Sequence, residues 1–436
     1  MKKTYKDDPV SFLRSLFKVA VAAAMPNFKE LGLAFPSPMP GKIIVIGAGK
    51  GAASMAKSFE QAAKEFWSAA DYERIQGLVV TRYGHSIDCE KVEVIEASHP
   101  VPDNAGQEAA QRILGLIDNL CSDDLVVFLA SGGGSALLTI PVDGVTLDEK
   151  RDINKQLLQC GATIFEINCV RKHLSKIKGG RLAQLCHPAK VLTYAISDIP
   201  GDDPSIIASG PTLPDASTCK DALRVIDKYS LKVSDFILQG LKSGALETPK
   251  ESNALFASVL PPVILTTAEK SLDAAKKYAQ ANELNVEILS DCIEGEAQEV
   301  GSVFGAMSKW IARNESDSIF KKPILLISGG ETTVTVKGTG RGGRNTEFLL
   351  SFAHAVNGAN GIYAIAADTD GIDGSEDNAG ATYSPKTIQK GKDFGMDLVE
   401  RLNCNDSYKF FGATGDLLLT GPTRTNVNDF RAILII

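Results

Sequence analysis

Lys42-Ile-Ile-Val-Ile-Gly-Ala-Gly-Lys50 is the stretch that decides the fold, because a continuous apolar run ends there in a glycine turn. Such a run indicates a strand buried on both faces, and the following residues predict a helix that begins near Ser54. Similar apolar runs, each followed by a polar or glycine-rich turn, recur at residues 77–81, 92–95, 125–129 and 191–196. The first half of the chain therefore predicts a three-layer α/β/α domain with a largely parallel sheet.

A second series of short apolar runs follows residue 262. Its members are 263–266, 286–289, 324–327, 332–336, 362–366, 417–420 and 431–435. The alternation within 332–336 and the closeness of the last two runs predict hairpins, and therefore a mixed sheet. Residues 216–260 have a helical, polar pattern that ends at Pro261-Pro262, where we expect the junction between two domains.

The length and charge of the chain limit the classes of protein to consider. Its 436 residues exceed one ordinary core, so we expect an N-terminal α/β domain at 1–250 and a C-terminal α/β domain at 251–436. The formal net charge of -7 argues against nucleic acid as a partner. No apolar run reaches the roughly 18 residues of a membrane span, so we expect no membrane partner.

The cysteines and the N-terminus indicate a cytoplasmic protein. The eight cysteines include no C-x-x-C pair, which favours free thiols over disulfides or a metal cluster. Near the N-terminus, Phe12, Leu13, Leu16, Phe17 and Ala20 recur at helical spacing between charged residues. We therefore expect an amphipathic helix on the first domain rather than an export signal.

The first glycine turn is a candidate phosphate site in a Rossmann-like domain. Gly47, Gly49 and Ala52 satisfy a relaxed dinucleotide fingerprint, and Lys50 would project over the strand ends. The next apolar run ends in Thr81-Arg82 rather than in the acidic residue that holds the ribose of NAD, although Arg82 could bind the 2′-phosphate of NADP. A solvated lysine remains the alternative for Lys50.

The second glycine turn follows the apolar run 125–129 and comprises Ser131, Gly132, Gly133, Gly134 and Ser135. Consecutive glycines can form a nest of N–H groups for phosphate or carboxylate, and the two hydroxyls can add donors. The G-x-S-x-G pattern of a hydrolase nucleophile is absent. Close packing between helix and strand is the alternative explanation for the glycines.

The third candidate is the turn formed by Arg341, Gly342, Gly343, Arg344 and Asn345. Arginine offers planar, bidentate donors to phosphate oxygens, and glycine lets the main chain approach an anion closely. A surface turn with solvated arginines is the alternative.

Carboxylates cluster after several predicted strands. Asp198 and Asp203 follow run 191–196, Glu331 follows run 324–327, and Asp370 follows run 362–366. Oxygen-rich loops of this kind suit Mg²⁺ held together with nucleotide phosphates. Each segment could instead be an ordinary aspartate- or glycine-containing turn.

A basic run extends from Arg171 to Arg181 and includes Lys178. Five cations within eleven residues of an acidic protein favour a surface that faces an anionic substrate, with a solvated helix face as the alternative. His99 could carry a proton, but a turn histidine fixed by the neighbouring prolines is the favoured reading.

Taken together, these motifs resemble the class II glycerate 2-kinases with a C-terminal MOFRL domain. The resemblance is carried by Gly47–Lys50, Ser98–Asp103, Ser131–Leu138, Val170–Arg181, Ser197-Asp198, Ala208–Thr212, Gly342–Asn345, Thr420–Thr423 and Thr425–Asp429. Two departures are Thr346, where relatives usually carry Gln, and Gly51, where they usually carry Ala. Both leave the reaction in place and leave substrate preference open.

The resemblance implies transfer of the ATP γ-phosphoryl group to the 2-hydroxyl of D-glycerate with Mg²⁺, in a cleft between the domains. Lys50 and Arg344 would contact the phosphoryl group or the substrate carboxylate, Asp198 or Asp203 would hold Mg²⁺, and Asp198 would accept the hydroxyl proton. The remaining candidates would bind substrate or nucleotide: Gly47, Gly49, Ser131, Gly132, Gly133, Gly134, Ser135, Lys178, Arg181, Glu331, Arg341, Gly342, Gly343, Asn345 and Asp370.

Two other functions stay open at this stage. An NADP-dependent hydroxypyruvate reductase is one, because some members of the family have carried that label. A nucleotide sensor without catalysis is the other. The sequence leaves the choice between monomer and homodimer open.

Overall fold

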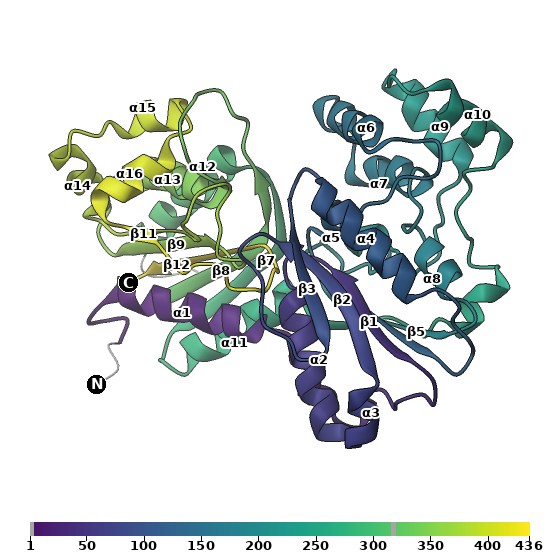
Figure 1. Cartoon of the computed structure of the whole chain (residues 1–436). Coiled ribbons are helices and arrows are strands. Elements are labelled where there is room, and N and C mark those ends of the chain that lie inside the picture. Colours follow the sequence, from purple (N-terminus) through teal and green to yellow (C-terminus); the bar gives the residue numbers. More distant parts are fainter. Residues whose placement is uncertain (1–3, 315–319) are drawn as a thin grey trace. The chain divides into compact units, whose positions relative to one another are not determined.

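The computed structural model describes residues 4–314 and 320–436 and divides them into two compact units (Figure 1). The N-terminal unit comprises residues 26–197 and 202–265, and the C-terminal unit comprises the chain up to Met25, residues 198–201 and residues 266–436. This division differs from a single junction at residue 250. The N-terminal helix and the segment 198–201 make most of their contacts with C-terminal elements, so the N-terminal unit is an insertion within the C-terminal one.

Six strands form the sheet of the N-terminal unit in the order β3-β2-β1-β4-β5-β6. They are β1 (Ile43–Ala48), β2 (Ile75–Arg82), β3 (Val92–Ala97), β4 (Leu125–Ala130), β5 (Lys190–Ile196) and β6 (Val263–Thr266). The pairs β1–β2, β2–β3, β1–β4 and β4–β5 are parallel, which confirms the predicted parallel sheet. Strand β6 was expected to open the second domain, but it extends this first sheet instead.

The strand order reverses at β1, and this reversal produces the three layers. The connection through α2 (Ala52–Phe66) leads from β1 to β2, whereas the connection through α4 (Asn104–Leu116) returns from β3 to β4. Right-handed crossovers in opposite directions place their helices on opposite faces of a sheet. The turns after β1 and β4 therefore lie side by side at the carboxyl edge, where open α/β sheets bind ligands.

A helical subdomain follows β4. Its helices are α6 (Leu147–Gln159), α7 (Ile164–His173), α9 (Cys219–Lys228) and α10 (Asp235–Ser243). They share a core of their own that includes Ile153, Leu157, Val170, Ile226 and Ile237. The helical pattern predicted for residues 216–260 is confirmed by α9 and α10. Shorter helices complete the unit: η1 (Phe28–Ala34), α3 (Ala69–Glu73), α5 (Gly134–Leu137), α8 (Arg181–Cys186), η2 (Ile207–Ser209) and η3 (Ala254–Ser258).

The C-terminal unit has a mixed sheet with the order β11-β10-β9-β12-β8-β7. Its strands are β7 (Asn285–Glu296), β8 (Ile324–Thr333), β9 (Ile362–Asp368), β10 (Gly380–Tyr383), β11 (Leu417–Leu418) and β12 (Asp429–Ile435). Among the strand pairs described in residues 266–314 and 320–436, β7–β8 is parallel and the others are antiparallel. The mixed sheet is confirmed.

The two hairpins predicted here were wrong. Residues 332–333 continue β8, and the alternating residues beyond them form no strand. The last two strands do not pair with each other, because β11 pairs with β10 while β12 lies between β8 and β9. Closeness in sequence suggested a hairpin, but the apolar strand β12 gains more by lying at the buried centre of the sheet.

Alternate side chains of the central strands face two different helical layers. On β8, Leu325 and Ile327 join a core with α1 (Pro9–Ala23) and α11 (Ala268–Gln280). Ile324 and Leu326 join the opposite core. That second layer contains α12 (Ala297–Arg313), α13 (Arg344–Val356) and α16 (Ser407–Thr414), with α14 (Thr387–Asp393) and α15 (Leu398–Asn403) beside them.

Helix α1 is amphipathic as predicted, but it does not lie on the first domain. Its apolar face, Phe12 to Ala20, packs on α11 and on β9, β10 and β12 of the C-terminal unit. A helical stretch from Pro9 to Ala34 is long and apolar enough to pass a compositional test for a membrane span. Because the apolar face of α1 is buried against the sheet, α1 serves as a core helix in this structure.

Candidate active-site clusters

The two glycine turns of the N-terminal unit are in direct contact. The Gly51 amide donates to Ser131 Oγ at 3.0 Å, and the Lys50 amide donates to the Gly132 carbonyl at 2.8 Å. A Cβ added to Gly49, where φ is +142°, would lie 2.0 Å from Ser131 Oγ. Gly49 is therefore required for the turns to approach each other.

Lys50 and His99 lie beside Gly133. A Cβ added to Gly133 would lie 2.9 Å from Cδ2 of His99 and 3.5 Å from Cγ of Lys50. Gly133 has a φ of +82° and precedes the short helix α5, whose first turn includes Ser135. A lysine, an imidazole and a glycine-rich turn thus converge at the carboxyl ends of β1 and β4, where an anion would meet N–H donors and a positive charge.

Ser135 is held by a polar chain from a neighbouring segment. Its hydroxyl lies 2.7 Å from the hydroxyl of Ser209, which in turn donates to Oδ1 of Asn168 at 3.1 Å. Ala208 and Ser209 have φ values of +52° and +62°, which side-chain-bearing residues rarely adopt. Strain of this kind costs about 1–3 kcal/mol per residue and gathers at functional sites. Ser209 and Asn168 were missed as site residues, although the segment 208–212 was among the motifs of the resemblance.

The basic run does not form a solvent-facing surface. Lys178 is buried and donates to the Leu138 carbonyl at 2.8 Å, while Arg181 donates to the carbonyls of Ser175 and Leu246. Burial, together with nearby Lys150, holds the pKa of Lys178 well below its usual range. The structure therefore gives Lys178 and Arg181 main-chain partners within the N-terminal unit.

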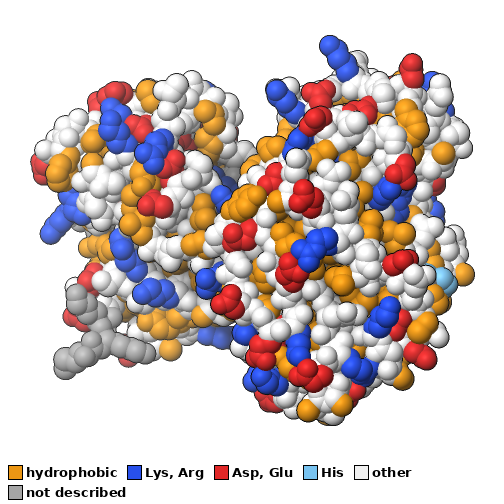
Figure 2. Space-filling view, in the orientation of Figure 1, with side chains coloured by type: hydrophobic (Ala, Val, Ile, Leu, Met, Phe, Trp, Pro, Cys, Tyr) orange, Lys and Arg blue, Asp and Glu red, His pale blue; other side chains and the backbone are white. Residues whose placement is uncertain are grey.

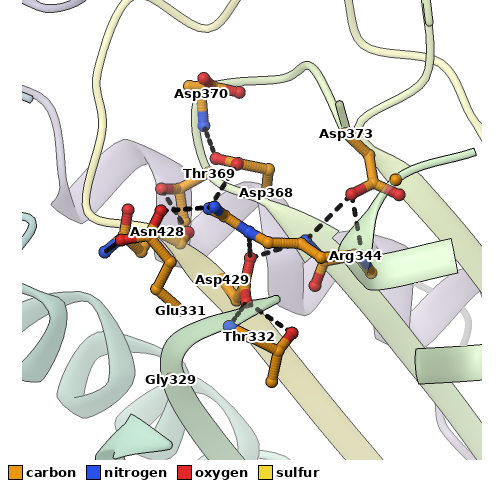
Figure 3. A network of polar contacts seen from close by, with 12 residues as sticks. Gly329, Glu331, Thr332, Arg344, Asp368, Thr369, Asp370, Asp373, Asn428 and Asp429 are labelled. Carbon is orange, nitrogen blue, oxygen red and sulfur yellow. Dashed lines mark hydrogen bonds and ion pairs between the residues drawn. The ribbon is translucent and has the colours of Figure 1, made fainter. Parts of the chain in front are cut away.

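Arg344 is the centre of the second cluster, in the C-terminal unit (Figure 3). Its Nε lies 2.7 Å from Oδ1 of Asp429, one terminal nitrogen lies 2.8 Å from Asp368, and the other lies 2.5 Å from Glu331. Burial would lower the pKa of Arg344, but these carboxylates outweigh that effect and raise it. The guanidinium is thus a fixed cation within an acidic cluster.

Asp429 is shared between two guanidinium groups. Oδ1 faces Arg344, whereas Oδ2 accepts from Arg431, whose side chain is buried and lies over the Phe348 ring. Burial would raise the pKa of Asp429, but Arg344 and Arg431 outweigh that effect and lower it. Asp429 is therefore ionised at neutral pH and fixes the orientation of Arg344.

The space beside the two glycines before Arg344 is occupied by other side chains of the protein. A Cβ on Gly342 would lie 2.2 Å from Oγ of Ser407, and a Cβ on Gly343 would lie 2.4 Å from Asp373. Asp373 accepts from the amides of Asn345 and Thr346 at 2.9 and 2.8 Å and so caps the N-terminus of α13. These contacts give the glycines and Asn345 a positioning role. They also show why a threonine fits at position 346, since its hydroxyl donates to Asp373 at 2.8 Å.

Arg341 lies apart from this acidic cluster. It pairs with Glu376, stacks on Tyr408 with 4.8 Å between guanidinium and ring centre, and leaves 63% of its side chain exposed. Of the two arginines in the turn, Arg344 alone pairs with Glu331, Asp368 and Asp429 in the described structure.

Asp198 belongs to the C-terminal unit and contacts the segment before β12. Its Oδ2 accepts from Asn426 at 2.9 Å, and its carbonyl accepts from Asn428. Asn428 also donates to Glu331 at 3.2 Å, which links Asp198 to the Arg344 cluster. Asp203 belongs to the other unit, where it accepts from the Ser205 amide in a turn.

The oxygen atoms of Asp198 and of nearby amide side chains are suitable ligands for a hard cation. Within the part of the chain that the structure describes, the buried amide oxygens of Asn426 and Asn345 have no hydrogen-bond donor. Carboxylate and amide oxygens are the ligands that Mg²⁺ takes. Asp198 and Asn426 thus offer oxygens of the kind that Mg²⁺ binds, whereas Asp203 accepts a main-chain hydrogen bond within a turn. Asp370 is also a turn residue, since its amide donates to Asp368 and its Oδ1 accepts from the Ile372 amide.

Asp368, Asp429, Asn426 and Asn428 were missed as site residues. The segment 425–429 was quoted as a motif, but nothing in one sequence told which of its side chains turn inward. Burial of Asp368 and Asp429, which are 3% and 2% exposed, is the signal that identifies them.

Two family models match the chain, and each covers one end of it. The model described as "Domain of unknown function (DUF4147)" matches residues 12–242, and the MOFRL family model matches residues 324–429. The chain is thus a two-domain α/β protein in which a DUF4147 domain precedes a MOFRL domain.

Similar proteins span almost the whole chain. A "D-glycerate 2-kinase" from Thermotoga maritima is 39% identical over 98% of this chain and 100% of its own length. A crystal structure of glycerate kinase from the same organism has a TM-score of 0.84 and covers 98% of this chain and 99% of that one. A protein from Agrobacterium vitis named "Putative hydroxypyruvate reductase" is 46% identical over 97% of this chain and 94% of its own length. The chain belongs to the glycerate kinase family.

Proposed function

We propose that this chain is a glycerate 2-kinase, which transfers the γ-phosphoryl group of ATP to the 2-hydroxyl of D-glycerate. The observation that carries the proposal is the full-length similarity to the Thermotoga maritima D-glycerate 2-kinase at 39% identity. The two clusters support it, because one offers a lysine over a glycine-rich turn and the other offers ordered carboxylates around an arginine. Phosphoryl transfer needs such positioning and charge compensation more than covalent chemistry.

The reaction assigns a role to each cluster. The substrate 2-hydroxyl oxygen attacks the γ-phosphorus, the bond to the β,γ-bridging oxygen breaks, and ADP leaves with that oxygen. We propose that Lys50 and the turn from Ser131 to Ser135 compensate the charge of the phosphoryl group and hold the nucleotide phosphates. Asp198 accepts the hydroxyl proton. That both clusters act in one cleft stays a prediction.

Arg344 acts in this proposal as an orienting cation. Its three carboxylate partners, Asp429, Asp368 and Glu331, keep it immobile, and an immobile charge stabilises a transition state without reorganisation. Because Glu331 is half exposed, an anionic substrate group could take its place on Arg344. This exchange would let the second cluster recognise a carboxylate or a phosphoryl oxygen.

Asp198 and Asn426 are the groups that would hold Mg²⁺. The ion supplies charge neutralisation along the triphosphate when it is bound. The buried Oδ1 of Asn426, which has no donor within the described residues, is the observation behind this choice. An intracellular location stays a prediction. Whether the protein is a monomer or a homodimer stays open. On the face drawn in Figure 2, acidic and basic side chains are interspersed.

A hydroxypyruvate reductase is the second candidate, because the Agrobacterium vitis relatives carry that name. The classical Rossmann strand order of the N-terminal sheet also permits a dinucleotide. Arg82 at the end of β2 could bind the 2′-phosphate of NADP. Against the reductase, hydride transfer would give the acidic cluster around Arg344 no role.

The test separates the candidates by the nucleotide that is consumed. The purified protein is incubated with D-glycerate and MgATP, and separately with hydroxypyruvate and NADPH. We expect ADP to form and NADPH to remain. Phosphorus NMR of the product then distinguishes the 2-phosphate from the 3-phosphate ester. Oxidation of NADPH without ADP formation would refute the kinase, and binding of ATP without turnover would identify a sensor.

A further inference from the structure

A histidine, a cysteine and a glutamate converge in the helical subdomain of the N-terminal unit. His173 is the last residue of α7, Cys219 is the first residue of α9, and Glu247 follows α10. One ligand atom from each lies within 4.8 Å of the other two. His173 and Cys219 are buried, whereas 35% of the Glu247 side chain is exposed. None of the three has a role in the proposed phosphoryl transfer.

The hydrogen bond of His173 leaves its other nitrogen facing a carboxylate. Nδ1 lies 2.8 Å from the Cys169 carbonyl, which can only accept, so Nδ1 carries a proton. In the neutral ring, Nε2 then directs a lone pair at Oε1 of Glu247, only 3.2 Å away. The Lys250 ammonium lies 2.6 Å from the same carboxylate oxygen and supplies one positive charge. A cation directly between Nε2 and Oε1 would be either a second proton on the imidazole or a metal ion.

The thiol favours the metal ion. A second proton on His173 would allow an ion pair with Glu247 but would not involve the Cys219 thiol. A zinc ion would use all three groups, because imidazole nitrogen, thiolate sulfur and carboxylate oxygen are its usual ligands. The bond from Nδ1 to a backbone carbonyl is also the support that metal-binding histidines commonly receive. One thiolate and one carboxylate balance the two charges of the ion, which suits a largely buried site.

Solvent can reach the cluster from one side. A polar hollow of about 380 Å³ is lined by Glu247, Gln184, Lys250 and neighbouring residues. The hollow opens the Glu247 carboxylate to solvent, so an ion would enter from the Glu247 side and a water molecule would be its fourth ligand. The Lys250 ammonium lies 2.6 Å from Oε1 of Glu247, while Oε2 accepts from the Cys219 amide at 3.0 Å. Metal binding would therefore require Lys250 to move partly away from the carboxylate.

We propose that His173, Cys219 and Glu247 bind one zinc ion that joins α7, the start of α9 and the segment after α10. On binding, the zinc–sulfur bond forms and the thiol proton passes to solvent. The ion would connect three segments of the subdomain, and its fourth position would remain open to water. The ligands lie far apart in sequence and follow no zinc motif, so only the fold brings them together.

The test measures metal binding directly, with the reduced and metal-free full chain. Zinc is titrated in competition with a chromophoric chelator, and Co²⁺ is used as a spectroscopic probe. We expect one zinc ion per chain, a thiolate-to-cobalt charge-transfer band, and intense visible bands of a tetrahedral centre. C219S should abolish the charge-transfer band and weaken zinc binding at least tenfold, since the loss of even a supporting group costs about 10–100-fold.

Two further variants keep the test decisive. E247Q changes a partly exposed side chain, so the folded protein should be obtained even if C219S is unstable, and it should also bind zinc more weakly. C169S is the matched control, because it changes a buried thiol of the same subdomain but keeps the carbonyl that holds His173. It should bind zinc as the unaltered chain does. Absence of stoichiometric zinc binding, or unchanged binding by E247Q, would overturn the proposal in favour of a doubly protonated His173.

Discussion

The charge of Asp429 should be a large contributor to the stability of the C-terminal unit. Asp429→Asn keeps the shape of the side chain but removes the negative charge between Arg344 and Arg431. Arg344 would keep Asp368 and Glu331, whereas the buried Arg431 would keep the neutral contacts with Thr332, the Gly329 carbonyl and the Phe348 ring but lose its paired carboxylate. Removing one partner of a buried ion pair costs about 3–5 kcal/mol, and we expect a loss of that size in the free energy of unfolding.

The two tryptophans provide the assay. Trp67 belongs to the N-terminal unit and Trp310 to the C-terminal unit, and the chain has two tryptophans in total. In a Trp67→Phe background, the fluorescence of Trp310 on α12 reports unfolding of the C-terminal unit in urea. Arg341→Ala is the matched control, since it breaks the exposed pair with Glu376 in the same turn as Arg344. Exposed pairs contribute about 0–1 kcal/mol. A loss below about 1 kcal/mol for Asp429→Asn would refute the reasoning.

The pH dependence gives a second check on Asp429. Its pKa in the folded state lies below the ordinary value of 3.8, so its contribution is fully present above the unfolded pKa. That contribution is lost as the pH falls through the folded value. The difference between the unaltered chain and Asp429→Asn should thus be constant from pH 7 to pH 5 and shrink only in strong acid. A difference that shrinks near pH 6 would contradict this assignment.

Three further changes test the N-terminal unit. Lys50→Ala should lower kcat about 10²–10³-fold, as loss of one transition-state contact does, while near-ultraviolet circular dichroism stays unchanged; unaltered ADP formation would remove Lys50 from the site. Gly133→Ala should raise the KM for ATP and cost stability, because its Cβ would meet His99, whereas Gly84→Ala has a similar φ of +80° in open space and should show backbone strain alone. Equal losses of stability and equal KM values for Gly133→Ala and Gly84→Ala would show that the clash with His99 has no effect. Thr163→Ala removes the cap of α7 and should cost about 1 kcal/mol in urea unfolding; no change would show that the cap is dispensable.

The sequence was sufficient for the parallel sheet, because β1 and β4 are buried along their whole length and β2 and β5 each contain a continuous buried stretch. It failed where pairing partners are distant. Strand β12 looked like half of a hairpin with the preceding run, yet it lies between two strands that are far from it in sequence. Likewise, the sequence pattern of α1 predicted its apolar face, but it did not indicate which of the two sheets this face packs against.

Candidate site residues were predictable where the backbone itself is unusual. The positive φ of Gly49 and Gly133 follows from glycine-rich turns after strands, and both lie where the sequence suggested. Side chains that act through partners were less accessible. Lys178 was predicted to face an anionic substrate or nucleotide, and only the fold shows its main-chain carbonyl partner. Asp429 looked like one more polar residue near the end of the chain, and only burial identifies it as the pivot of two arginines.

The interrupted C-terminal unit has a consequence for synthesis of the chain. Helix α1 leaves the ribosome early, but Thr425 donates to the Ala24 carbonyl across 401 residues, and β12 comes later still. Until those segments emerge, the apolar face of α1 has no sheet to cover it, while the inserted unit can already fold. Nascent chains that stop short of β12 would expose that face together with the open edges of β8 and β9, and both attract chaperones or aggregate.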